Sequence, residues 1–231
     1  MKVILEGIVG STAYGLARPG SDIDLLGVYL APVNDFLGLH PPNDKNSTVA
    51  RNAPDATYHE LTKFCRLALK VNPTITELLW LGAYEKSTFD GRLLIDLRRH
   101  FLSAPAVKGA YLGYAKDQFY RIKRRESNDF SSDTRNRTSK HARHLLRLLN
   151  QGLELWRTGD LEVRVADPEM YFEFGERVEG GDVDHALQVL ESFECEFNRL
   201  PTNLPTHPNV SLITEAVVEI RRQHLDDQPS W

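Results

Sequence analysis

The chain has 231 residues and carries 28 Lys and Arg against 32 Asp and Glu, a formal net charge of −4. This acidic balance excludes a protein held to nucleic acid by overall charge alone, although it leaves room for a local basic surface. A hydrophobic share of 41% and a charged share of 26% are ordinary for a globular protein and exclude a wholly disordered chain. The length fits one large domain or two small ones.

No apolar stretch approaches the roughly 20 residues that a membrane-spanning helix needs. The apolar run at residues 3–9 is broken by Glu6 and Gly7 and lacks the layout of a signal peptide. The two cysteines, Cys65 and Cys195, lie outside any CxxC or Cys/His cluster, which argues against a disulfide framework or a structural zinc site. We therefore expect a cytoplasmic protein that does not associate with membranes.

The first half of the chain alternates short apolar runs with turn-rich segments. Apolar residues at 3–9 and 23–30 predict two buried strands. The Gly-, Ser- and Pro-rich residues 11–20 between them predict a loop or a single helical turn. Residues 31–52 carry further Pro and Gly together with Asn and Asp, and they predict a long surface excursion.

Strand and helix signals continue after this excursion. Residues 56–60 predict a third strand, and apolar positions with helical spacing predict a helix over 61–70. Pro73 then marks the start of a second helix, with Asn72 or Thr74 as its N-cap.

The second half predicts helices alone, the first of them beginning near Ala106. The Pro-rich residues 201–208 predict a linker or turn rather than a domain boundary. We therefore predict an α/β fold with a small mixed, mostly antiparallel sheet in residues 1–103 and a helical region in residues 104–231. The amphipathic stripes of that region lie at 142–156, 183–197 and 213–220.

Basic residues gather in one part of the helical region. Residues 116–147 contain ten Lys and Arg and four Asp and Glu, which gives this segment a charge of +6 in a chain of −4. A solvated helical face is the ordinary interpretation, and a surface that faces phosphates is the functional one. The basic residues are Lys116, Arg121, Lys123, Arg124, Arg125, Arg135, Arg137, Lys140, Arg143 and Arg147.

Two carboxylates stand at the start of the second expected strand. Asp22 and Asp24 are separated by one apolar residue, so strand alternation would place both carboxylates on one face and turn Ile23 into the core. Adjacent carboxylates repel each other unless a cation lies between them. Oxygen ligands alone suit Mg²⁺, which binds carboxylates together with substrate phosphates, and Mn²⁺ is the alternative.

A Gly-Ser pair directly follows the first expected strand. Gly10 permits close approach of the backbone to a ligand, and the N–H groups after the turn, with the Ser11 hydroxyl, would bind a phosphate oxygen. Alone, a Gly-Ser turn or an Asp-x-Asp is a common structural feature. In this order, between two apolar strands, they predict a site for a metal-bound triphosphate, where a hydroxyl attacks the α-phosphorus and pyrophosphate leaves.

Residues 10–30, GSTAYGLARPGSDIDLLGVYL, closely resemble the signature of the DNA polymerase β-type nucleotidyltransferase superfamily, a Gly-Ser followed by a strand with Asp-x-Asp. Residues 61–80, 101–118 and 140–163 extend the resemblance to the predicted nucleotidyltransferases associated with RNA ligases and RNA repair. Together these pieces cover most of residues 1–165. The resemblance implies a nucleotidyltransferase core in the first half of the chain.

The resemblance also implies roles for individual residues. Gly10 and Ser11 match the phosphate-binding pair, and Asp22 and Asp24 match the metal-binding pair. The superfamily normally has a third carboxylate on a later strand, which binds the catalytic metal and helps to activate the attacking hydroxyl.

Three acids are candidates for this third carboxylate. Asp55, just before the third expected strand, matches the narrower family best and ranks first, and Glu60 at the end of that strand ranks second. A capping role at a helix start suffices to explain Glu77. We expect the strand of Asp55 to lie next to the strand that bears Asp22 and Asp24.

The loop between the two motifs holds weaker candidates for nucleotide binding. Arg18 and Tyr14 either contact the triphosphate or the base, or anchor the loop. Ser21 of the same loop is a further nucleotide-binding candidate.

The helical region supplies its own candidates. Lys140, His144 and Arg147 have i, i+4, i+7 spacing, which predicts one polar helix face able to hold the phosphates of a nucleotide or of RNA. His141 lies nearer the apolar stripe, where a buried and hydrogen-bonded imidazole is the favoured interpretation.

Three functions follow from these motifs. The first is Mg²⁺-dependent transfer of a nucleoside monophosphate from an NTP to an RNA 3′ end, and the second is nucleotidylation of a protein or a small molecule. The third is an inactive nucleotide- or RNA-binding module that lacks the third carboxylate. The basic segment favours RNA, and we expect it to form a continuous surface that opens onto the site of Asp22 and Asp24.

Overall fold

The computed structural model describes residues 1–37, 39–52, 54–126 and 132–225. It divides into two compact units, the first made of residues 1–102 with 207–231 and the second of residues 103–206. Among the helices that the structure describes, none is both long and apolar enough to cross a membrane.

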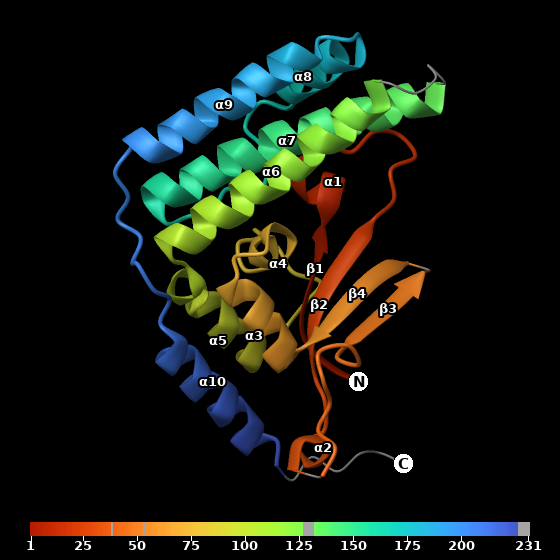
Figure 1. The fold of residues 1–231 in the computed structure, drawn as a ribbon. Helices are drawn as coiled ribbons and strands as arrows, with labels where there is room; N and C mark the ends of the chain where they lie inside the picture. Colours follow the sequence, from red (N-terminus) through yellow and green to blue (C-terminus); the bar gives the residue numbers. More distant parts are fainter. Residues whose placement is uncertain (38, 53, 127–131, 226–231) are drawn as a thin grey trace. The chain divides into compact units, whose positions relative to one another are not determined.

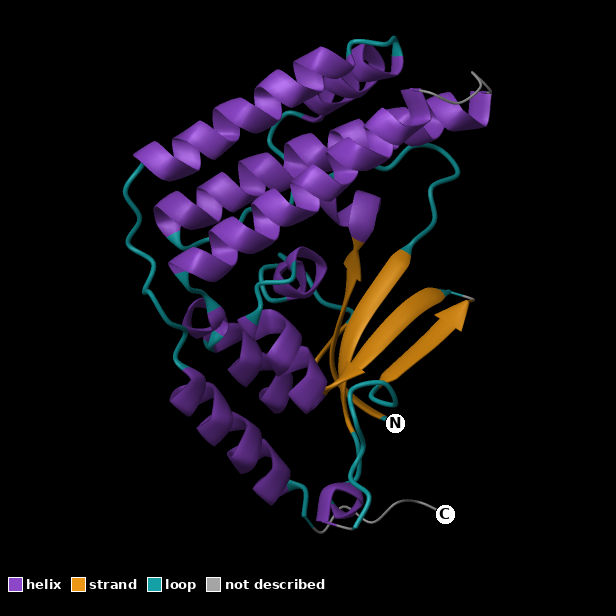
Figure 2. Cartoon of the chain, viewed as in Figure 1, coloured by secondary structure: helices purple, strands orange, loops and turns teal. Residues whose placement is uncertain are grey.

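A five-stranded mixed sheet forms the centre of the first unit (Figures 1 and 2). Its order is β3-β4-β2-β1-β5, and β2 and β4 form the parallel pair while the other neighbours are antiparallel. The strands are β1 (Lys2–Val9), β2 (Asp24–Leu30), β3 (Thr48–Asn52), β4 (Asp55–Glu60) and β5 (Lys86–Ser87). The mixed, mostly antiparallel sheet predicted from the sequence is confirmed.

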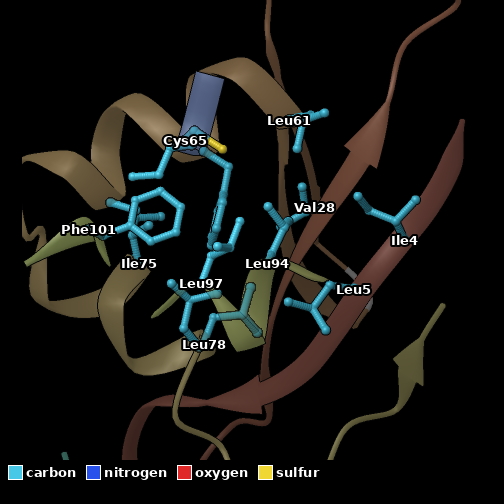
Figure 3. Packing of buried hydrophobic residues seen from close by; sticks show 14 of the residues in the cluster. Ile4, Leu5, Val28, Leu61, Cys65, Ile75, Leu78, Leu94, Leu97 and Phe101 are labelled. Atoms are coloured by element: carbon cyan, nitrogen blue, oxygen red, sulfur yellow. The ribbon is translucent and has the colours of Figure 1, made fainter. Parts of the chain in front are cut away.

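Several helices of the first unit pack against this sheet and bury a large apolar cluster, and a smaller cluster forms around Tyr29, Ala56 and Tyr58. In Figure 3, Leu5 and Val28 of the strands face Leu94 and Leu97, which belong to the helical layer. The helices are α1 (Gly10–Tyr14), α2 (Asn34–Leu37), α3 (Leu61–Leu69), α4 (Pro73–Leu78), α5 (Phe89–Asp96) and α10 (Val210–Gln223), with a short 3₁₀ turn, η1 (Arg98–Phe101).

Local sequence explains where two of these helices begin. The Glu60 carboxylate accepts a hydrogen bond from the Thr62 N–H and caps α3, whose apolar residues then recur at helical spacing. Asn72 caps α4 through the Ile75 N–H, with Pro73 as the first helical residue. Asn72 rather than Thr74 is therefore the N-cap.

The predicted division into residues 1–103 and 104–231 differs from these two units in where it places the last helix. Helix α10 belongs to the first unit, where Ile213, Ala216 and Ile220 join the same apolar cluster as the sheet. The boundary falls at residues 206/207, inside the Pro-rich segment that was predicted to be a mere linker or turn. Periodicity shows that α10 has an apolar face, but only packing decides which core that face joins.

The second unit consists of helices. It contains α6 (Ala104–Glu126), α7 (Ser132–Thr158), α8 (Pro168–Glu179) and α9 (Val183–Arg199), and Figure 1 shows α6 and α7 running side by side. Gly152 of α7 permits close contact, because a Cβ there would collide with the Tyr111 side chain of α6. The stripes at 142–156 and 183–197 are thus helical as predicted.

One segment of the first unit differs from its prediction. Residues 31–52 are not only a surface excursion, because they include α2 and the edge strand β3. Strand β3 pairs antiparallel with β4, from Thr48↔His59 to Asn52↔Asp55. Its sequence lacks a clear apolar alternation because all five residues are partly or fully exposed, as an edge strand allows.

Candidate active site at the β2–β4 strand ends

Asp24 and Asp55 lie side by side in the sheet. Strands β2 and β4 run parallel, and their first residues, Asp24 and Asp55, are register partners. Register partners on parallel strands point to the same face, so the two carboxylates share one face at one end of the sheet. Asp55 is exposed and Asp24 is half-buried. The expectation that the Asp55 strand neighbours the Asp24 strand is confirmed.

The Gly-Ser motif meets this carboxylate pair. Val9, the last residue of β1, is the register partner of Asp24, so Gly10 follows at the same end of the sheet. Gly10 has a φ of +70°, and a Cβ at this position would collide with Oδ2 of Asp24. Glycine is therefore required both by the backbone conformation and by the approach of the carboxylate.

Helix α1 continues directly from the glycine. Val9 is its N-cap, with no side-chain cap hydrogen bond, and the first N–H groups of a helix have no partners within the helix. Gly15 ends α1 in a left-handed conformation. The backbone beside Asp24 therefore begins with N–H donors that suit an anion.

Tyr14 anchors this motif to the core. Its hydroxyl donates a 2.6 Å hydrogen bond to Oε2 of Glu77, and both side chains are buried, Glu77 fully so. The anchoring interpretation of Tyr14 is the one that the structure supports. Asn72 caps α4, and the Glu77 carboxylate binds Tyr14 of α1, a contact that the sequence did not predict. No spacing rule links residues 63 positions apart, so the sequence carried no signal of this pair.

The loop between the motifs folds as a tight turn. The Arg18 N–H donates to the Ser21 hydroxyl at 2.9 Å, and the Ser21 N–H donates to the Arg18 carbonyl at 2.9 Å. Both residues are exposed. The Ser21 hydroxyl thus has a structural partner, and the nucleotide-binding roles of Arg18 and Ser21 stay predictions.

Asp22 precedes the strand instead of opening it. Strand β2 begins at Asp24, so alternation along a strand does not fix the direction of the Asp22 side chain. The prediction that Ile23 turns into the core is wrong, since its side chain is 53% exposed. The apolar cluster covers β2 from Leu26 onward, and Ile23 lies before the strand begins.

Glu60 occupies the other end of β4. It is the register partner of Tyr29, five residues beyond Asp55, which at about 3.3 Å per residue is roughly 16 Å along the strand. Its buried carboxylate accepts hydrogen bonds from Thr62 and from Arg221, the latter at 2.7 Å. Asp55 is therefore the acid beside Asp24, and Glu60 stabilises the fold.

Within the part of the chain that the structure describes, no group of three or more His, Cys, Asp or Glu side chains is arranged to hold a metal ion. The geometry brings together Asp24, Asp55 and Gly10. The three-carboxylate metal site of Asp22, Asp24 and Asp55 stays a prediction.

The candidate phosphate-binding residues of the second unit differ in how deeply they are buried. Lys140 is exposed, His144 is half-buried, and Arg147 is only 1% exposed. Arg147 of the predicted polar face is therefore buried, and it donates hydrogen bonds to Gln151 and to Nδ1 of His144. His141 is half-buried and hydrogen-bonded to Gln118, as favoured from the sequence.

The basic segment is partly neutralised. Lys116 forms an ion pair with Glu194 at 2.9 Å, and the Arg143 guanidinium lies over the Phe172 ring. The side chains of Arg125 and Arg135 lie outside the described residues. The described and exposed members are Arg121, Lys123, Arg124, Arg137 and Lys140. The expected continuity of this surface with the acidic site stays a prediction.

A mixed sheet that sets a Gly-Ser turn beside aspartates on neighbouring strand ends is the arrangement expected of a polymerase β-type nucleotidyltransferase core. Residues 1–170 match the family model described as the RNA repair pathway DNA polymerase beta family, RlaP. The chain therefore belongs to this family.

A curated relative shows a more limited similarity. The chain is 30% identical over 129 residues to an uncharacterized 38.9 kDa protein of the nrdC-mobD intergenic region of Enterobacteria phage T4. The match covers 51% of this chain and 38% of the phage protein, so the chain spans well under half of that relative.

Proposed function

We propose that this protein transfers a nucleoside monophosphate from an NTP to the 3′ hydroxyl of an RNA, with release of pyrophosphate. The observation that supports this most directly is the register of Asp24 with Asp55, at the strand end where Gly10 closes against the Asp24 carboxylate. In a metal-bound triphosphate, the acid pair would bind the positive metal ion. The N–H donors at the start of the neighbouring turn would bind the negative phosphates.

Each residue of the site has a proposed task. Gly10 and Ser11 bind a phosphate oxygen through the first N–H groups of α1 and the Ser11 hydroxyl, with Arg18 and Ser21 from the following turn. Asp55, the more exposed acid, orients the attacking hydroxyl and accepts its proton. Tyr14 and Glu77 position α1 without touching the substrate.

The donor set fits a divalent magnesium ion, with manganese as the alternative. Asp24 and Asp55 offer only carboxylate oxygens on one face, the ligand type that Mg²⁺ prefers, and Asp22 is the third proposed ligand. When bound there, the ion supplies charge neutralisation at the α-phosphorus and at the leaving pyrophosphate.

The proposed RNA acceptor rests on the second unit. Helix α6 exposes Tyr114 and Tyr120 together with Arg121, Lys123 and Arg124. Exposed aromatic rings among basic side chains suit a single strand, because bases stack on the rings while the cations meet the phosphates. This combination favours RNA over a small-molecule acceptor.

A transfer assay tests the proposal. The full chain is incubated with each labelled NTP, Mg²⁺ or Mn²⁺, and an RNA with a free or a blocked 3′ hydroxyl, beside a set of protein acceptors. We expect label on the free 3′ end only, and loss of labelling in Asp24→Asn but not in Asp96→Asn, an exposed acid at the end of α5. Label on protein would establish the alternative acceptor class, and no transfer to any acceptor would favour an inactive binding module.

Salt dependence tests the acceptor separately. The double change Lys123→Ala with Arg124→Ala should weaken binding of all RNAs about equally and reduce the salt dependence of binding, because phosphate contacts release counterions and carry no base information. Arg157→Ala with Arg164→Ala removes the same charge from other exposed positions of the second unit and serves as the control. Equal weakening by both pairs would contradict a role for the α6 surface.

A further inference from the structure

The α6–α7 pair carries a group of basic side chains around a buried arginine, Arg147. Arg147 is buried at 1% exposure, and its Nη1 donates to the Oε1 of Gln151. The Nε2 of Gln151 donates in turn to the carbonyls of Glu162 and Val163, at 3.3 and 3.1 Å. The guanidinium is thus held in one position inside the helical unit.

This fixed guanidinium determines the state of the neighbouring imidazole. The Nη2 of Arg147 lies 2.9 Å from the Nδ1 of His144, and a guanidinium can only donate hydrogen bonds. Nδ1 of His144 must therefore accept, which leaves its hydrogen on Nε2 at the other edge of the ring. Burial, followed by the charges of Arg147, His141, Arg121 and Lys140, lowers the pKa of His144 well below its usual range, so the ring is a neutral donor.

The surroundings of that donor are positively charged. Arg121 projects from α6, and Lys140 stands one helical turn before His144 on α7; both are exposed while His144 is half-buried. Their charges act on the imidazole along with those of Arg147 and His141. Cations held near one N–H donor repel each other, and an anion bound among them would relieve that repulsion.

We propose that Arg121, Lys140 and the Nε2–H of His144 form a phosphate-binding site in the helical unit, with Arg147 as the residue that positions His144. The site is distinct from the Gly10–Ser11 turn. It rests on the proposed function only for the source of its phosphate, which is either a nucleoside triphosphate or the RNA.

Nitrogen NMR of the imidazoles in the full chain gives a test that is specific to this site. With ¹⁵N-labelled histidine, the signal of His144 is assigned from its loss in His144→Gln. We expect the Nε2–H tautomer at neutral pH and a shift of this signal when inorganic phosphate is titrated. Lys140→Ala, an exposed change, should weaken the phosphate affinity read at His144 by about tenfold. Lys108→Ala on α6, where Lys108 bonds Asn198, should leave it unchanged.

Further titrations identify the source of the phosphate. A lower half-saturation for ATP than for RNA assigns the site to the nucleotide, and the reverse order assigns it to RNA. An unchanged His144 signal at saturating phosphate, ATP and RNA would overturn the proposal, as would equal affinity in Lys140→Ala. Because the signal is read at His144, a protein that binds phosphate there but transfers no nucleotide would contradict the proposed function alone. A protein that transfers nucleotides without this shift would contradict the phosphate site alone.

Discussion

The two ends of strand β4 carry acids with opposite surroundings. Asp55 at its start is exposed, and its register partner is another carboxylate, Asp24. Glu60 at its end is buried and forms an ion pair with Arg221, whose guanidinium lies over the Phe36 ring at 3.9 Å. One end therefore places two carboxylates on one face of the sheet, and at the other end an arginine neutralises a buried acid.

This contrast separates function from stability. Two carboxylates side by side destabilise a fold unless a cation binds, whereas a buried acid that meets an arginine ties two elements together. Glu60 and Arg221 join β4 to α10, a helix more than 150 residues away in sequence. Substitutions at the two ends should consequently affect different measurements.

The largest expected effect is on the transfer rate at the Asp24–Asp55 end. Asp24→Asn and Asp55→Asn should each lower kcat about a thousandfold, because metal charge neutralisation supplies several kcal/mol. The free energy of unfolding of Asp55→Asn should stay equal to wild type or rise, since one of two adjacent negative charges is removed. Glu60→Gln, at the other end, should keep near-normal kcat in the folded fraction. A similar loss of kcat in Glu60→Gln would erase the distinction between the two ends.

The largest effect on stability belongs to the Glu60 end. Arg221→Ala should lower the free energy of unfolding by about 3–5 kcal/mol, because it leaves the buried Glu60 carboxylate without its cation. Urea unfolding measures the loss, and hydrogen exchange should show α10 opening first. Arg222→Ala removes the same charge from the exposed neighbouring position and should change stability little. Equal losses in the two variants would show that the ion pair does not hold α10.

Gly10 and Gly20 distinguish backbone strain from close approach to the Asp24 carboxylate. Both have a positive φ, +70° and +84°, so replacement of either by Ala should cost about 1–2 kcal/mol from backbone strain. At Gly10 the new Cβ also collides with the Asp24 carboxylate, while at Gly20 nothing lies within 4 Å. Gly10→Ala should therefore lose more stability than Gly20→Ala, as measured by urea unfolding. It should also lose transfer activity in the labelling assay. Matching activities in the two variants would contradict the close approach.

Tyr14 links the acidic end to the core. Tyr14→Phe removes a donor from the buried Glu77 carboxylate and should cost about 1–3 kcal/mol, with a lower kcat/KM for the NTP. Tyr84→Phe removes a hydroxyl that donates at 2.9 Å to the Leu78 carbonyl at the end of the same helix, α4. It should cost about 1 kcal/mol and leave kcat/KM unchanged. Steady-state kinetics on both variants distinguish positioning of α1 from general loss of packing.

The smallest expected effect is a pH dependence of the free energy of unfolding, which arises from His59 near the end of β4. Burial and the charge of Lys63 lower the pKa of His59 from its ordinary value of 6.5 to about 4. Between these two pH values the unfolded chain binds a proton that the folded chain does not, so stability should fall as pH decreases from about 6.5 to about 4. His59→Asn can keep a hydrogen bond with the Thr48 hydroxyl and cannot titrate, so urea unfolding at several pH values should show a weaker pH dependence of stability. An unchanged slope would assign the pH dependence to other groups.

Sequence reasoning worked where a signal is local. Apolar alternation and glycine or proline punctuation predict β1, β2, β4 and α3 because neighbouring residues alone determine these elements. The order of Gly10-Ser11 and Asp22-x-Asp24 likewise indicates the chemistry, because it lies in one continuous stretch. The family resemblance favours Asp55 as the third acid, and only strand pairing shows that it lies beside Asp24.

Tertiary structure decided everything that depends on distant partners. Glu60 and Glu77 have the same chemistry as Asp55, but Arg221 and Tyr14 lie 161 and 63 positions away from their acids, and no local pattern encodes those contacts. Helix α10 has an ordinary amphipathic face, and packing alone assigned it to the core of the first unit. Periodicity put Arg147 on a polar face, whereas hydrogen bonds to Gln151 and His144 allow its burial. Local sequence thus determines which elements form, while burial and charge pairing between remote residues determine which acids and bases remain available to a ligand.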